Sequence, residues 1–108
     1  TSTIRHFMSE VIFEHRIRSQ KDLNFELDRV YANLDRASSW VTHFYDLYTE
    51  ALATRNQKKI EKYIKEWRDS VKVRDEDREL IRKMKIFGES KGYVIDESTK
   101  KRLESRNL

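Results

Sequence analysis

The histidines of this sequence, with the carboxylates near them, are its best candidates for acid–base or metal chemistry. His6 and Glu10 are four residues apart, the spacing of two ligands on one helical face, and His43, Asp46 and Glu50 could share another face. Metal sites in helical bundles, however, usually repeat a Glu-x-x-His set on facing helices, and that spacing does not recur here. We interpret these histidines as surface residues and expect no metal and no cofactor.

Other catalytic patterns are also missing from the sequence. It has no cysteine, no Gly-rich phosphate loop and no nucleophile motif. Most carboxylates have a Lys or Arg three or four residues away, as in Glu61–Lys65 and Glu79–Lys83. Such spacing predicts ion pairs on exposed helical faces. We therefore expect a protein that is not an enzyme and has no small-molecule substrate.

The composition limits how large a core the chain can build. Of its 108 residues, 37% are apolar and 39% are charged, against about 45–50% and 25% in average soluble domains. One domain with a thin core is expected, and therefore a shape or an assembly that covers the remaining apolar surface. The sequence also lacks a membrane-spanning apolar run and a signal-peptide pattern, which predicts a cytoplasmic protein.

Helical periodicity runs from residue 4 to residue 87, with no proline in the chain and no glycine before Gly88. The first helix is expected near residues 3–18, followed by a turn near 19–22 that Ser19 or Asp22 could cap. Its apolar face consists of Ile4, Phe7, Met8, Val11 and Ile12.

The second helix is expected over residues 21–55 and carries four heptads of apolar residues without a break in phase. This phase passes through Ser38 and Ser39, so we favour one continuous helix over a break at these serines. From residue 40 onward the apolar face widens, which predicts that residues 40–52 lie in the main core and that the narrower seam of residues 23–37 packs against one or two helices. The full seam is Leu23, Leu27, Val30, Leu34, Ala37, Val41, Phe44, Tyr48 and Ala51.

The remaining chain predicts a turn at residues 54–59, another helix, a glycine cap at Gly88 or Gly92, and a short last helix capped by Asp96 or Ser98. The fold class is therefore all-α: an elongated antiparallel helical hairpin or a three-helix bundle, with a coiled-coil-like seam and a short C-terminal helix. We expect a helical bundle domain over residues 1–92, and an extended segment plus a short helix over 93–108.

The seam also indicates how the protein could act. The first and third helices have enough apolar surface to cover residues 40–52, which leaves the narrow part of the seam without a cover. We therefore expect a helical adaptor or assembly module that binds itself as a homodimer, or another helical protein. The predicted interface residues are Leu23, Leu27, Val30, Leu34, Ala37 and Val41.

A rival interpretation is a nucleic-acid-binding accessory protein. Residues 55–108 carry 17 basic and 11 acidic side chains, so the basic excess lies in the second half, and a basic helical face can neutralise phosphates. A helix-turn-helix over residues 88–108 is disfavoured, because its break is too long and because Asp96 and Glu97 open its last helix. The candidate contacts are Arg55, Lys58, Lys59, Lys62, Lys65, Lys72, Lys100, Lys101 and Arg102.

Overall fold

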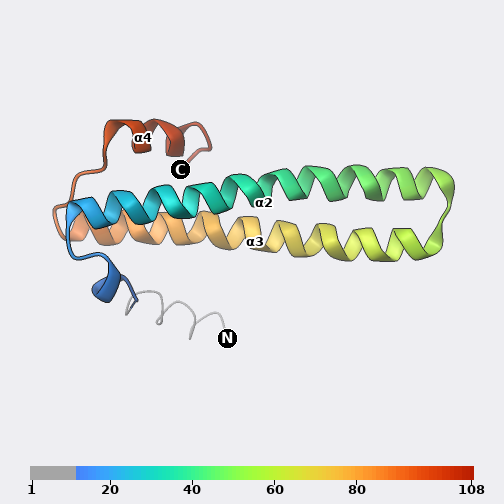
Figure 1. Cartoon of the computed structure of the whole chain (residues 1–108), viewed down its shortest axis with the longest axis horizontal. Coiled ribbons are helices and arrows are strands. Elements are labelled where there is room, and N and C mark those ends of the chain that lie inside the picture. The colour runs from blue at the N-terminus through green and yellow to red at the C-terminus, as the bar shows by residue number, and fades with distance from the viewer. Residues whose placement is uncertain (1–11) are drawn as a thin grey trace. The chain divides into compact units, whose positions relative to one another are not determined.

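A computed structural model describes residues 12–108, and these residues form helices joined by short connections (Figure 1). Helix α2 spans Gln20–Thr54, α3 spans Gln57–Ser90 and α4 spans Glu97–Glu104, while residues 12–16 are also helical. The predicted all-α class is confirmed, with α2 and α3 as an antiparallel hairpin. Within residues 12–108, no helix is both long and apolar enough to cross a membrane. Ile4, Phe7, Met8 and Val11, with His6 and Glu10, lie outside the described residues.

Contacts divide the chain into two compact units. Of the described residues, unit 1 contains 12–31 and 78–108, and unit 2 contains 32–77. Helices α2 and α3 contribute to both units, and each unit contains one part of each helix. Residues 93–108, expected to form a region of their own, belong to unit 1 together with the start of α2 and the end of α3.

Helix α2 begins at a serine cap and continues without a break. The Ser19 hydroxyl accepts a hydrogen bond from the backbone N–H of Asp22 (3.2 Å), which satisfies one of the free donors of the first turn. Further along, the Ser39 hydroxyl donates to the carbonyl of Asp35 (3.2 Å). Such a bond to the carbonyl four residues earlier destabilises a helix only slightly, and the predicted continuity through Ser38 and Ser39 is confirmed.

Two residues, Arg55 and Asn56, form the turn between α2 and α3. Arg55 has a positive φ of 55°, its N–H bonds to the carbonyl of Leu52, and the N–H of Asn56 bonds to that of Ala51. This pair of bonds is the Schellman motif, which normally places glycine at the left-handed position. The Asn56 side chain then caps α3 by accepting from the N–H of Lys59 (3.2 Å). The turn lies inside the predicted range but is shorter than predicted.

The end of α3 uses the same motif with the preferred residue. Gly92 has a φ of 75°; its N–H bonds to the carbonyl of Glu89, and that of Tyr93 bonds to the carbonyl of Gly88. Gly88 itself is buried, and a Cβ at this position would overlap the side chain of Leu23. Gly92 is therefore required for its backbone conformation, and Gly88 for the close approach of α3 to α2 within unit 1.

Unit 1 contains a core built from four segments of the chain. Phe13 packs against Phe87 with ring centroids 5.7 Å apart, and Glu14 forms an ion pair with Lys91 (3.3 Å). Residues 12–17 are therefore packed in unit 1. The prediction that the first helix covers residues 40–52 is wrong for these residues. The buried apolar residues of unit 1 are Phe13, Ile17, Leu23, Leu27, Val30, Ile81, Met84 and Leu103.

A buried amide holds the C-terminal segment onto α2. Asn24 is only 6% exposed; its Nδ2 donates to the carbonyls of Gln20 (2.9 Å) and Val94 (3.0 Å), and its Oδ1 accepts from the N–H of Asp96 (2.7 Å). The amide therefore uses both of its donors and its acceptor. In addition, the Oε1 of Gln20 accepts from the N–H of Val94 (2.9 Å).

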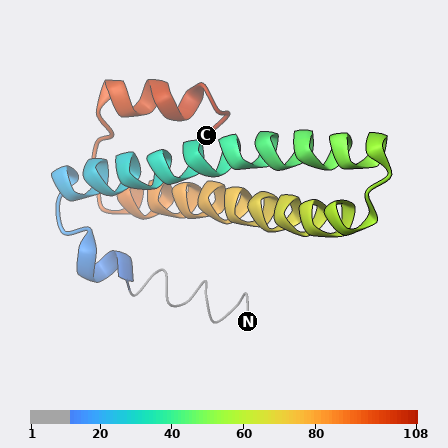
Figure 2. The same cartoon turned by 45° about the vertical axis from the view of Figure 1, so that its right-hand side comes forward.

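One turn further along α2, Asp28 holds α4. Its Oδ1 accepts from the hydroxyl of Thr99 (2.9 Å) and from the guanidinium of Arg102 (3.0 Å). Gln20, Asn24 and Asp28 are spaced by four and therefore form one polar stripe on α2. Figures 1 and 2 show α4 beside the first part of α2, where this stripe lies.

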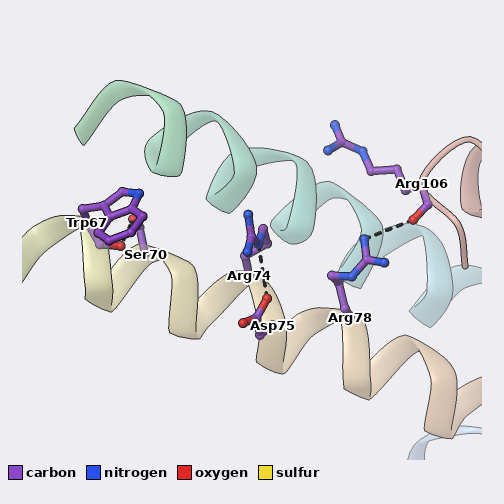
Figure 3. A network of polar contacts seen from close by, with 6 residues as sticks. All are labelled: Trp67, Ser70, Arg74, Asp75, Arg78 and Arg106. Atoms are coloured by element: carbon purple, nitrogen blue, oxygen red, sulfur yellow. Dashed lines mark hydrogen bonds and ion pairs between the residues drawn. The ribbon is translucent and has the colours of Figure 1, made fainter. Parts of the chain in front are cut away.

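The residues after α4 make further contacts within unit 1. The guanidinium of Arg78 donates to the carbonyl of Arg106 (3.0 Å), as Figure 3 shows, and the side chain of Arg106 lies over the ring of Tyr31. The same figure shows two contacts of unit 2, the ion pair of Arg74 with Asp75 and Ser70 beside Trp67. Residues 71–79, which are almost wholly charged, are a helical part of α3.

Replacing Asn24 with Ala is expected to lower the free energy of unfolding by about 2 kcal/mol, because three hydrogen bonds in a buried site are lost. Hydrogen exchange should show the amide of Asp96 exchanging faster, while that of Val94 stays protected by Gln20. In the matched variant Gln20→Ala, the amide of Val94 should exchange faster while that of Asp96 stays protected by Asn24. The loss of stability should be smaller than in Asn24→Ala. Equal exchange of both amides in both variants would contradict this account.

Replacing Arg55 with Gly is expected to stabilise the protein by about 1 kcal/mol, because an L-residue with positive φ carries a steric cost that glycine avoids. The matched change is Gly92→Ala, where an added Cβ would meet no atom within 4 Å and only the backbone cost applies. It should destabilise by about the same amount. Urea unfolding measures both, and a less stable Arg55→Gly variant would show that the turn does not need this conformation.

Candidate functional site

The predicted interface residues are mostly buried within the single chain. Leu23, Leu27 and Val30 are buried in unit 1, and Leu34 and Ala37 are buried in unit 2; Leu23, Leu27 and Leu34 are 0% exposed. Of the six predicted residues, only Val41 keeps part of its surface exposed. The narrow seam is therefore covered by its own chain, and the inference that a second copy is needed to cover it does not hold.

The wide face of residues 40–52 shows the opposite outcome. It was expected in the main core, but Trp40 is 47% exposed, Tyr45 48% and Leu52 46%. The physical reason is that the described part of unit 2 contains only two helical segments, and two paired helices bury one narrow stripe between them. The prediction of a core location is therefore wrong for these three side chains.

The aromatic side chains of α2 gather into an exposed cluster. The rings of Trp40 and Phe44 are stacked at 5.3 Å, and His43 lies edge-on to Trp40 at 5.7 Å. The ring of Tyr45 contacts Trp67 of α3 at 5.9 Å. Because the rings are held against each other on helices, the cluster is a rigid surface that loses little conformational entropy when it is covered.

The surface around these residues has a sequence signal that the heptad analysis missed. Residues 37–54 contain only two charged side chains, Asp46 and Glu50, in a chain that is 39% charged. A helix with an exposed outer side normally carries charges there. Depletion of charge together with exposed aromatic residues is the composition found in the centre of protein interfaces. We call residues 37–54 the charge-poor segment.

Exposed apolar residues also occur in unit 1, where Phe25, Ile86 and Val94 are the most exposed. Charged residues stand directly beside two of them in the sequence, as Glu26 and Lys85 illustrate. Single apolar side chains among charged ones are normal on protein surfaces. The charge-poor segment of unit 2 differs because its apolar residues are many and adjacent.

The predicted basic residues are all exposed, and they are divided between the two units. In unit 2 they are Arg55, Lys58, Lys59, Lys62, Lys65 and Lys72. In unit 1, Lys100 and Lys101 are exposed, but Arg102 binds Asp28 (3.0 Å) and thus helps to hold α4. Arg102 therefore has a structural partner that its place in a basic run did not predict.

Ion pairs form at the expected spacing, as in Glu26–Arg29 (2.7 Å), but the two pairs given as examples do not. Neither Glu61–Lys65 nor Glu79–Lys83 lies within 4 Å in residues 12–108; Glu79 instead pairs with Arg82 at 3.6 Å. The basic side chains of unit 2 named above take part in no ion pair within this range. Their charges are therefore available to a partner.

The candidate metal residues His43, Asp46 and Glu50 are exposed on α2. Across the described range, no group of three or more His, Asp or Glu side chains is placed to hold a metal ion. The His43 ring instead contacts Trp40 and Phe44, which makes it part of the aromatic cluster.

Comparison of the chain with known protein families, with curated proteins and with solved structures finds no match. The functional argument therefore depends on the surface of the molecule itself.

Replacing Trp40 with Gln is expected to change the free energy of unfolding by less than about 1 kcal/mol at low protein concentration, because half of the side chain is already in water. The matched change is Leu34→Ala, which removes a fully buried side chain of unit 2 and should cost about 2–5 kcal/mol. Denaturant unfolding measures both. A loss at Trp40 as large as that at Leu34 would show that the aromatic cluster serves stability.

Proposed function

We propose that this protein is a non-enzymatic helical assembly module, which binds another protein or a second copy of itself through the charge-poor segment and the part of α3 beside it. One observation carries this proposal: none of the thirteen large apolar side chains between residues 40 and 73 is buried. Unit 1, by contrast, buries eight such side chains. A fold that completes one core and leaves the other apolar region half in water has surface left for a partner.

Covering this apolar surface with a partner would supply free energy for protein association. Removing apolar surface from water is worth about 25 cal/mol per Å2, from which the cost of association is subtracted. Aromatic residues such as Trp40 and Tyr45 dominate binding energy at many interfaces. Trp40 and Tyr45 are half exposed and already held by ring contacts. Their apolar surface is therefore accessible to a partner without rearrangement of the fold.

The proposal is non-enzymatic because the described residues combine ring contacts and exposed charges rather than a catalytic arrangement. His43 lies between aromatic rings, and the exposed basic residues of unit 2 from Arg55 to Lys72 named above form no ion pair within residues 12–108. What the surface offers is apolar area with charges at its border, which suits binding.

A second candidate function is nucleic-acid binding by the basic residues of unit 2. The observation that favours it is that Lys58, Lys62 and Lys65 are exposed and form no ion pair in the part of the chain described. Phosphates could therefore bind without breaking internal contacts. We place this candidate second, because it leaves the apolar surface of the charge-poor segment unexplained.

Site-specific photo-crosslinking tests the proposal. The chain is expressed in its native cells with p-benzoylphenylalanine in place of Trp40, and in a control variant in place of Glu79, which is exposed on α3 within unit 1. The Trp40 position should form a strong crosslink to a protein, and the Glu79 position a weak one or none. No crosslink above the control would contradict the proposed function.

A further inference from the structure

The two helical segments of unit 2 carry opposite charges on their exposed sides. The charge-poor segment of α2 has two acidic residues and no Lys or Arg, so its net charge is −2. Residues 57–72 of α3 have six basic and three acidic side chains, so their net charge is +3. The chain therefore carries, on one unit, both members of a complementary pair of surfaces.

These opposite charges do not neutralise each other within the described chain. Tyr45 lies level with Trp67 across the hairpin, and antiparallel helices advance by the same rise per residue. Glu50 is therefore level with Lys62, and Asp46 is level with Glu66, which directly follows Lys65 in the sequence. No ion pair joins Asp46 to Lys65 or Glu50 to Lys62 within residues 12–108, and all four side chains are exposed.

From this arrangement we infer that unit 2 binds a second copy of the chain, with the charge-poor segment of α2 against residues 57–72 of the partner's α3. This inference rests on the proposed function. The pairing places Trp40, Phe44 and Tyr45 in the interface, and it brings the two acidic residues of the charge-poor segment to a segment of the other copy whose net charge is +3. Because the contact is the same in both directions, it satisfies the symmetry of a two-fold dimer.

The available area agrees with such a dimer. The charge-poor segment is about 27 Å long at 1.5 Å per residue, and two helices side by side are roughly 20 Å wide. The projected area of this face is then roughly 500 Å2, and the uneven surface of the side chains adds to it. This value is close to the lower end of the roughly 600–1,000 Å2 that each partner buries in stable interfaces. An apolar centre with charges at its border also matches the usual anatomy of interfaces.

Sedimentation equilibrium of the full chain tests the inference directly. Over about 5–200 μM protein, the chain should form a dimer, and raising the salt from about 50 to 500 mM should weaken it several-fold, because border charges are screened. A monomer at all concentrations and both salts would overturn the inference.

Charge exchange tests the arrangement of the two copies. The variants Asp46→Lys/Glu50→Lys and Lys62→Glu/Lys65→Glu should each dimerise at least tenfold more weakly than the wild type, and an equal mixture should recover the wild-type affinity to within a few-fold. The control Lys100→Glu/Lys101→Glu makes the same charge change as Lys62→Glu/Lys65→Glu, but in unit 1. It should not weaken dimerisation. If the mixture does not recover, the proposed pairing of α2 with α3 is wrong.

Two further measurements keep the test decisive. Circular dichroism checks that each variant is folded. If Asp46→Lys/Glu50→Lys is not folded, the milder variant Asp46→Asn/Glu50→Gln replaces it, and dimerisation of this milder variant should no longer depend on salt. A monomer that binds a generic DNA duplex, and loses this binding with Lys62→Glu/Lys65→Glu, would overturn the inference in favour of phosphate contact. A Trp40 crosslink to a different protein would overturn the inference alone, whereas no crosslink would contradict the proposed function as well.

Discussion

The hydrogen bonds of Asn24 are the constraint on which the architecture of unit 1 depends. A buried amide costs free energy unless all its polar atoms are paired, and this one is paired only when the backbone at Val94 and Asp96 lies against α2. Those bonds fix where the chain goes after the Gly92 cap. Thr99 and Leu103 of α4 are then buried against the rest of unit 1, which completes the core at that end.

Much of this fold follows from the sequence by simple periodicity. The seam from Leu23 to Ala51 predicted a continuous second helix, and the structure has α2 over Gln20–Thr54. Gly92 was one of two predicted caps, and its left-handed conformation is confirmed. These predictions succeeded because heptad spacing and glycine conformations are local properties, which depend on few neighbours.

The partner of each apolar face could not be predicted in the same way. An amphipathic pattern shows that a helix has a side to bury, but it does not show what covers that side. For this reason the first helix was assigned to cover residues 40–52 through a face that included Ile12, although Ile12 is exposed and Phe13 and Ile17 are the residues buried, in unit 1. The role of Asn24 was also missed, because its bonds reach residues about 70 positions away in the sequence.

The candidate surface was predicted as a wide apolar face in the core, and the interface was predicted at the narrow seam instead. Trp40, Tyr45 and Leu52 were recognised as a wide face and were assigned to the core, since most aromatic stripes are buried. The absence of Lys and Arg between Arg36 and Arg55 would have been the better guide. A helix that is only a core element keeps charges on its water side, whereas a helix that will be covered there does not need them.

The two-residue turn at Arg55 and Asn56 also has a consequence for the order in which the protein assembles. Contacts beside the turn, such as Tyr45 with Trp67, join positions 22 apart, whereas Asn24 and Val94 are 70 apart. The entropy lost on closing a loop grows with its length by about 0.6 kcal/mol per doubling, so the distant contact costs about 1 kcal/mol more to form first. Closure from the turn outward is therefore favoured, and the half-covered helices of unit 2 meet before unit 1 has completed its core.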